Sequence, residues 1–197
     1  MHWSDLGIVL GWRSFGENQR VLTVLTQQYG LHRGMIFGRT QTLVLGWILH
    51  VRWKGVSETH LGTFKVDDCV PLNLELYDNP LGFMLLELMC HLCIGGLHFH
   101  IPCLEIYQAF LVSMTMLPEE KGLRAYVLFE AHTLCYLGHE DMQVHYFIHH
   151  WQSPKAVCVH NQWIHQEQIW KRVGKHWKNW QAMKQRAYHK IFNNHTE

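Results

Sequence analysis

The amino-acid sequence predicts an α+β chain, in which a small five-stranded β-barrel over residues 1–78 is followed by a helical bundle domain over residues 79–197. Two patterns support this prediction. Short β-branched and apolar runs separated by glycine-containing turns fill the N-terminal part, and from Leu81 onward apolar residues recur every three or four positions. A chain of 197 residues with 48% hydrophobic content is long and apolar enough to build both cores.

Each predicted strand in the N-terminal part ends at glycine or another turn-forming residue. The first run turns at Gly16-Glu17-Asn18, which is typical of a hairpin. The fourth run alternates polar residues with Leu49, Val51 and Trp53, the period of a strand with one buried face. Glycines at the corners let the strands of a small closed barrel bend, and an SH3-like or other small barrel fits the same pattern. The predicted strands span residues 7–13, 21–25, 31–37, 47–54 and 61–66.

Helical periodicity begins at Leu81, directly after Pro80, a residue that the first turn of a helix tolerates. A second helix is predicted from Leu104 to Met114. A third is predicted from Pro118 to Leu137, with Gly138 as its C-terminal cap. After a loop, one apolar stripe predicts a final amphipathic helix and comprises Trp170, Val173, Trp177, Trp180 and Met183.

Charge is distributed unevenly along the chain. The 17 Lys and Arg and the 16 Asp and Glu leave a formal net charge of +1, so a surface for a polyanion must be local. The acidic excess falls in residues 81–150 and the basic excess in residues 151–197. There Lys171, Lys175 and Lys178 share one face of the final helix, either as a phosphate-contacting surface or as an ordinary solvated face.

The chain shows no signal for export or for a membrane. Its start carries the acidic Asp5 and no secretory signal, and the apolar stretch from Leu81 to Cys103 is interrupted by charged and polar residues such as Glu87. We therefore expect a soluble cytoplasmic protein with reduced cysteines.

No catalytic motif stands out in the sequence. It contains no G-x-S-x-G, P-loop, G-x-G-x-x-G or H-E-x-x-H motif. Cys90 and Cys93 have the spacing of a zinc-binding pair, but they lie in an apolar helical run without a second pair, which favours core residues. We expect no enzyme, no cofactor and no metal. A metal-dependent enzyme is the weaker alternative, and it would use the His- and Cys-rich zone of His145, His149, His150, Cys158, His160 and His165.

The predicted barrel contains the residue types of a nucleic-acid surface. Basic side chains neutralise phosphates and aromatic side chains stack on bases. About half of the candidates must face inward, and Trp47 and Trp53 belong more often to a core than to a binding platform, because tryptophan buries a large apolar area. The candidates are Trp12, Arg13, Arg33, Phe37, Arg39, Trp47, Arg52, Trp53 and Lys54.

Several short motifs are distributed along the chain. In the barrel they are Trp3-Ser4-Asp5, Gly7-Ile8-Val9-Leu10-Gly11, Gly16-Glu17, the run from Val21 to Thr26, Tyr29-Gly30, Gly34, Gly38-Arg39 and Leu61-Gly62-Thr63-Phe64. Further on they are Phe129-Glu130, Leu134, Leu137-Gly138 and Ser153-Pro154-Lys155. Together these motifs resemble the RecO family of bacterial recombination mediators, closely over residues 1–66, thinly over residues 80–140 and very weakly after residue 160.

The resemblance implies an OB-fold barrel and a role in DNA repair and homologous recombination. A protein of this family binds single- and double-stranded DNA, anneals complementary strands, recognises the C-terminal tail of single-stranded DNA-binding protein, and works with RecR to load RecA in the RecF pathway. Its implied location is the bacterial cytoplasm, at the nucleoid. The chain departs from the family in having only Cys158 where many relatives carry four zinc-binding cysteines, and in its shorter, His- and Trp-rich C-terminal part.

Charge and strand position predict that the barrel contacts DNA phosphates and that the basic C-terminal helix extends this track. The alternative is a protein-interaction scaffold, whose barrel is structural and whose helices bind a partner without direct DNA contact. The near-zero net charge of the barrel favours this alternative slightly. The predicted DNA-binding residues are Arg13, Arg33, Arg39, Arg52, Lys54, Lys171, Lys175 and Lys178.

Overall fold

A computed structural model of the chain describes residues 1–38, 43–57, 60–119 and 122–138. The chain divides into two compact units. The first comprises Met1–Leu74 together with Leu97–Gln108, and the second comprises Glu75–Gly96 and the described residues from Ala109 to Gly138. The predicted final helix, the His- and Cys-rich zone and Arg39 lie outside the described residues.

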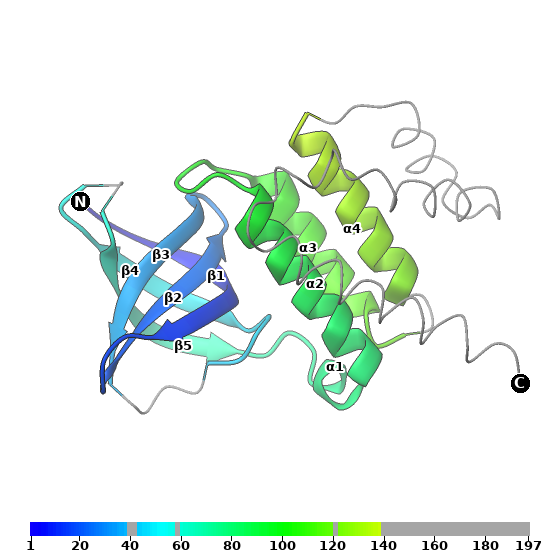
Figure 1. Ribbon diagram of the computed structural model, residues 1–197, viewed down its shortest axis with the longest axis horizontal. Coiled ribbons are helices and arrows are strands. Elements are labelled where there is room, and N and C mark those ends of the chain that lie inside the picture. Colours follow the sequence, from blue (N-terminus) through cyan, green and yellow to red (C-terminus); the bar gives the residue numbers. More distant parts are fainter. Residues whose placement is uncertain (39–42, 58–59, 120–121, 139–197) are drawn as a thin grey trace, which may run out of the picture. The chain divides into compact units, whose positions relative to one another are not determined.

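Five strands of the first unit close into a barrel (Figure 1). The strand order around it is β1-β2-β3-β5-β4, and β4 pairs with β1 to complete the circle. Neighbouring strands are antiparallel, except that β3 and β5 are parallel. This is the OB-fold that the resemblance implied. The strands are β1 (His2–Ser14), β2 (Gln19–Thr26), β3 (Gly30–Phe37), β4 (Ile48–Lys54) and β5 (Gly62–Val70).

The strands confirm the prediction, and β1 and β5 extend furthest beyond their predicted bounds. β1 begins at His2 rather than at Gly7, because residues 2–6 pair with β4 and place Trp3 opposite Trp53. β5 continues beyond Val66 along the same neighbour, to Val70. Both extensions depend on pairing with a strand that is distant in sequence, which a local pattern does not contain.

Two buried aromatic side chains close the barrel at its parallel junction. Trp53 is 1% exposed and Phe64 is 3% exposed. A Cβ atom at Gly62 would lie 2.2 Å from the Trp53 indole, and one at Gly34 would lie 2.6 Å from the Phe64 ring. The two glycines therefore let the rings lie directly against the strands. The other buried core residues are Val9, Leu22, Val24, Ile36, Leu43, Leu49 and Val51, with Trp47 packed partly buried against them.

Asp5 is a buried carboxylate that ties β1 to the turn between β2 and β3. Its two oxygens accept hydrogen bonds from the backbone N–H groups of Leu6 (2.9 Å) and Gln28 (2.7 Å). These bonds satisfy a charged group that is only 6% exposed. Together with burial, Asp5 also contributes to raising the pKa of the Tyr107 hydroxyl to about 12; burial is the larger cause.

Residues Leu97–Gln108 return to the barrel, although the sequence assigned them to the helical domain. The backbone N–H of His100 donates to the carbonyl of Leu31 at 2.9 Å, and Leu31 forms a parallel bridge with Phe99. Gly30, with φ of 71°, lies so close that a Cβ atom there would be 1.8 Å from the carbonyl oxygen of Ile101. The segment is thus held against the edge of β3 by backbone contacts, which the local residue pattern does not indicate.

The helices after the barrel follow the predicted periodicity. The Asn79 side chain caps α2, since its Oδ1 accepts from the Gly82 N–H at 2.9 Å and its Nδ2 donates to the Pro118 carbonyl at 3.0 Å. Gly138, with φ of 81°, follows α4 as predicted. The complete bundle, with its final basic helix, stays a prediction. The described helices are α1 (Glu75–Asp78), α2 (Pro80–Gly96), α3 (Leu104–Met116) and α4 (Gly122–Tyr136).

The apolar character of α2 reflects burial in protein. Both Cys90 and Cys93 are buried on this helix, and burial raises the pKa of the Cys90 thiol. Within the described part of the chain, no helix has the length and apolarity needed to cross a membrane. The C-x-x-C pair therefore belongs to the core, as its apolar surroundings predicted.

The contact between Gly30 and Ile101 predicts unequal effects of two glycine substitutions. Gly16 has φ of 73°, close to that of Gly30, but a Cβ atom at Gly16 would meet nothing within 4 Å. We expect Gly16→Ala to destabilise by about 1 kcal/mol, the cost of the left-handed backbone, and Gly30→Ala to destabilise by about 3 kcal/mol. Urea unfolding monitored by tryptophan fluorescence measures both. Equal losses would show that the Leu97–Gln108 segment is not held at Gly30.

Candidate nucleic-acid interface

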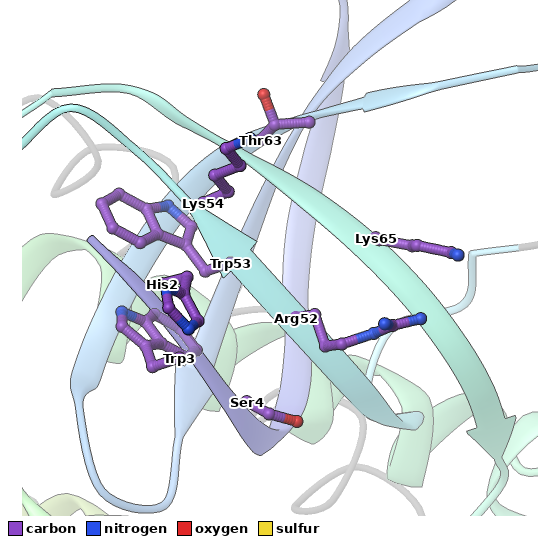
Figure 2. A pocket seen from close by; sticks show the side chains of 8 residues that line it. All are labelled: His2, Trp3, Ser4, Arg52, Trp53, Lys54, Thr63 and Lys65. Carbon is purple, nitrogen blue, oxygen red and sulfur yellow. The ribbon is translucent and has the colours of Figure 1, made fainter.

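A groove of about 500 Å³ lies on β1, β4 and β5 (Figure 2). Strand pairing aligns its polar residues in two rows. Ser4, Arg52 and Lys65 form one row, and the second row, two residues along the strands, comprises His2, Lys54 and Thr63. Because alternate residues of β4 point to opposite faces, the cations project outward while Trp53 packs inward. The lining residues are His2, Trp3, Ser4, Arg52, Trp53, Lys54, Thr63 and Lys65.

An aromatic cluster fixes the apolar wall of the groove. The Trp3 ring stacks between Tyr29 and Trp53, with centroid distances of 4.4 and 5.6 Å and interplanar angles of 11° and 14°. Phe64 and His32 contact the same indole edge-on. These contacts hold Trp3 in one orientation, so the groove has a preformed apolar surface beside its cations.

Lys54 and Lys65 are the exposed cations of the groove that make no ion pair among the described residues. Lys54 lies opposite Thr63, and Lys65 lies opposite Arg52. Lysine is a flexible point charge that adapts to a phosphate without fixed geometry. Both side chains are therefore suited to contact a polyanion.

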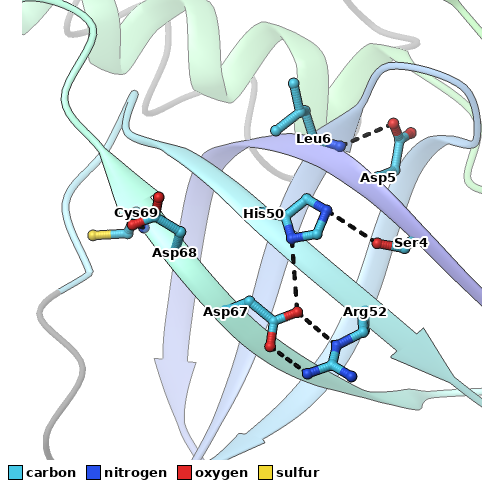
Figure 3. Close-up of polar contacts among 8 residues, drawn as sticks. All are labelled: Ser4, Asp5, Leu6, His50, Arg52, Asp67, Asp68 and Cys69. Atoms are coloured by element: carbon cyan, nitrogen blue, oxygen red, sulfur yellow. Dashed lines mark hydrogen bonds and ion pairs between the residues drawn. The ribbon is translucent and has the colours of Figure 1, made fainter.

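Arg52 differs from the lysines because its guanidinium already forms an ion pair with a carboxylate. Its Nε and Nη2 donate to the two carboxylate oxygens of Asp67 (Figure 3). Hydrogen bonding to Arg52 lowers the pKa of Asp67, and the same bonds raise the pKa of Arg52. His50 Nδ1 lies 3.6 Å from Asp67, and His50 Nε2 shares a hydrogen bond of 3.2 Å with the Ser4 hydroxyl. A phosphate must compete with Asp67 for Arg52.

A β-bulge explains why two consecutive acids lie on this face. Val51 pairs with Val66 but His50 pairs with Asp68, so Asp67 is an extra residue in β5. As a result Asp67 and Asp68 are both exposed instead of alternating across the strand. Two carboxylates thereby lie at one end of the β4–β5 face, Lys65 lies in the next row beside Arg52, and Lys54 lies in the row beyond.

Arg13 and Arg33 form a second cationic pair, at the far end of β1. Ser4 and Arg13 are nine residues apart, roughly 30 Å along an extended strand. Arg13 is exposed, whereas Arg33 is half-buried with its guanidinium carbon 4.3 Å from the centroid of the Phe99 ring. Burial lowers the pKa of Arg33, and the nearby charge of Arg13 lowers it further. The two arginines are close enough to repel each other.

The predicted site residues therefore divide into two groups. Arg52 and Lys54 share the groove, and Arg13 and Arg33 lie together elsewhere on the barrel. Arg39, Lys171, Lys175 and Lys178 lie outside the described residues.

Sequence reasoning missed Lys65 among the cations of the groove. The alternation of Thr63 and Lys65 with Phe64 and Val66 indicates an outward-facing lysine. Its position beside Arg52 follows from strand register, which the sequence does not show. Across the described ranges, no group of three or more His, Cys, Asp or Glu side chains is placed to hold a metal ion.

The barrel and its groove define a small OB-fold domain with a cationic outer face. Residues 1–70 match the family model described as "Recombination protein O N terminal". Through this barrel the chain is similar to the N-terminal part of the RecO family, and the relatives that match it support the same similarity.

Three proteins named "DNA repair protein RecO" illustrate the similarity. That of Anaplasma marginale (strain St. Maries) is 26% identical over 111 residues, which cover 56% of this chain and 47% of the relative. That of Hyphomonas neptunium is 34% identical over 104 residues, 50% of this chain and 43% of the relative. That of Mesorhizobium japonicum is 34% identical over 94 residues, 45% of this chain and 37% of the relative. The chain thus spans less than half the length of these relatives.

The buried His32 predicts a loss of stability in acid. His32 is 2% exposed and shares a hydrogen bond of 3.0 Å with His100; burial, then the charge of His100, lowers its pKa from 6.5 to about 4. Between these pH values the unfolded chain binds a proton that the folded chain does not. Stability from this site is complete above pH 6.5 and falls as the pH decreases toward 4.

Urea unfolding between pH 7.5 and 4.5 tests this dependence on His32. We expect His32→Gln to lower stability at pH 7.5 but to flatten the decline in acid, because the titrating group is gone. His98→Gln, at an exposed position, is the matched control and should keep the wild-type slope. Parallel pH curves for wild type and His32→Gln would contradict the assignment.

Proposed function

We propose that this chain acts in DNA repair and recombination by binding DNA, with the groove on β1, β4 and β5 as a phosphate-contacting surface. The observation that carries the proposal is the outward projection of Arg52, Lys54 and Lys65 from two adjacent strands, beside the apolar wall at Trp3. Adjacent strands are roughly 5 Å apart and alternate residues roughly 7 Å apart, so three cations share a compact face. The match of residues 1–70 to the RecO family model supports the same role.

The proposed activity is binding rather than catalysis, and it needs no cofactor. Phosphate contacts position a nucleic acid without reading its sequence, which suits a protein that must act on any damaged site. We propose Arg13 and Arg33 as further phosphate contacts, since their mutual repulsion favours an anion between or beside them. On the basis of their charge alone, we also propose phosphate contacts for Arg39, Lys171, Lys175 and Lys178.

The finer activities are proposed from the family resemblance. They are annealing of complementary strands and help in loading RecA onto DNA coated by single-stranded DNA-binding protein. The proposed partners are single- and double-stranded DNA, RecR and the C-terminal tail of single-stranded DNA-binding protein, in the bacterial cytoplasm at the nucleoid. The similarity to the relatives covers the barrel and extends thinly into the helices, less than half of each relative. These finer activities therefore need tests of their own, separate from the test of DNA binding.

Removal of either lysine of the groove should weaken DNA binding and flatten its salt dependence. Each phosphate contact to single-stranded DNA contributes about 0.7 to the slope of log K against log salt. We therefore expect Lys54→Gln and Lys65→Gln each to reduce the slope by about 0.7, measured by fluorescence anisotropy of a labelled oligonucleotide. Arg124→Gln, an exposed position on α4, makes the same change in net charge and should leave the slope unchanged.

Neutralisation of Asp67 should have the opposite effect, because it releases Arg52 for a phosphate. Asp67→Asn should tighten binding and steepen the salt slope by about 0.7. Asp68→Asn is a matched control with the same change in net charge, since Asp68 accepts from the Cys69 N–H and makes no contact with Arg52. Equal effects of the two variants would mean that Arg52 does not contact DNA.

The wild-type salt series decides between binding and the scaffold alternative. A steep decrease of affinity with salt supports the proposed function. Absence of binding at the lowest salt concentration would overturn it and favour a barrel that is structural.

A further inference from the structure

We propose that the outer face of the β1–β2 hairpin and the adjoining end of β3 is a base-stacking site for single-stranded DNA, with Phe15 and Phe37 as the platforms and Arg13 at the adjacent phosphate. The inference rests on the proposed function and deepens it, since it assigns a substrate form and residues to a surface outside the groove. The site is distinct from the groove because it lies at the other end of β1.

Strand pairing brings Phe15 and Phe37 to the same face. The Phe15 N–H donates to the Gln19 carbonyl at 2.8 Å, and Gln19 is paired with Phe37 on β3. The Gly38 N–H donates to the Asn18 carbonyl at 3.0 Å and fixes the end of the hairpin against β3. Gln19 therefore lies between the two phenylalanines in one cross-strand row, and paired residues point to the same side of a sheet.

Phe15 and Phe37 are the most exposed aromatic side chains in the described ranges, at 54% and 59%. Neither belongs to the core of the barrel. Trp12, at 41%, is paired with the buried Leu22, so the alternation of β1 directs it to the other face. Two apolar rings left in water in one cross-strand row at the end of the barrel indicate a surface that a ligand covers.

The charges beside the rings indicate what that ligand is. Arg13 precedes Phe15 by two positions, lies on the same face and is exposed. Arg33 lies near enough for the two positive charges to disfavour each other, and an anion would relieve this repulsion. The acid closest in sequence is Glu17, at the hairpin turn. Apolar rings beside paired guanidinium groups match the alternating bases and phosphates of a nucleic acid.

Single-stranded DNA fits this surface better than a duplex. The bases of a duplex are stacked on each other and offer no free faces, whereas unpaired bases stack on aromatic side chains. Stacking acts independently of sequence because every base has such a face. A protein partner or a second copy of this chain would use the rings but would have no equal need for the two arginines.

Replacement of each phenylalanine by leucine tests the proposal, because leucine keeps apolar bulk and removes the flat ring. We compare an oligo(dT) with an abasic strand of the same length by fluorescence anisotropy, using the full chain. Phe15→Leu and Phe37→Leu should each weaken oligo(dT) binding about tenfold and leave binding of the abasic strand and the salt slope unchanged. Tyr136→Leu, at an exposed aromatic position on α4, is the matched control and should bind both strands as the wild type does.

The outcomes separate this inference from the proposed function. If the wild type binds oligo(dT) and both phenylalanine variants bind it with the same affinity, the stacking site is overturned and the proposed function stands. No wild-type binding to either strand would overturn both. An equal loss of affinity for oligo(dT) and for the abasic strand would also overturn the stacking site. A change in sedimentation of the DNA-free variants would overturn it too, because it would show that the rings join copies of the chain. Thermal melting of each variant confirms that it is folded.

Discussion

The contact of Trp53 and Phe64 with the backbone at Gly62 and Gly34 is the interaction on which the barrel depends. β3 and β5 share only two paired positions, so their few hydrogen bonds do not by themselves hold the cylinder shut. Burial of the two aromatic rings over the junction supplies the missing stabilisation; loss of such a side chain typically costs about 3 to 5 kcal/mol. The same strand alternation that packs Trp53 inward directs its neighbours Arg52 and Lys54 outward. The strand alternation that closes the barrel therefore also places these cations on its surface.

The bulge in β5 controls the electrostatics of the groove. Without the extra residue, Asp67 and Asp68 would alternate across the strand and one of them would face the core. With it, both remain in water, and Asp67 pairs with Arg52 while Lys54 and Lys65 make no ion pair among the described residues. The net charge of the N-terminal part is thus near zero although acidic and basic side chains lie at different places on its surface. A polyanion responds to that separation rather than to the sum.

Two kinds of interaction are separated along β1. One end carries the lysine-rich groove, where the proposed phosphate contacts would release ions and depend on salt. The other end carries exposed aromatic rings beside Arg13, where the proposed stacking would depend on free bases and little on salt. A strand of DNA that reached both ends would be held by its backbone and by its bases. The RecO relatives are longer than this chain, and the barrel is the part that they share most clearly.

The sequence by itself determined the elements of this protein. Strand alternation and turn residues predicted the five strands, helical periodicity predicted α2, α3 and α4, and the size of tryptophan predicted that Trp47 and Trp53 are core residues. Tertiary structure decided the site: Lys65 beside Arg52, Asp67 on the guanidinium, Phe15 in one row with Phe37, and Leu97–Gln108 against β3. The physical reason is that element type follows from periods of a few residues, whereas register, bulges and long-range contacts depend on partners distant in sequence.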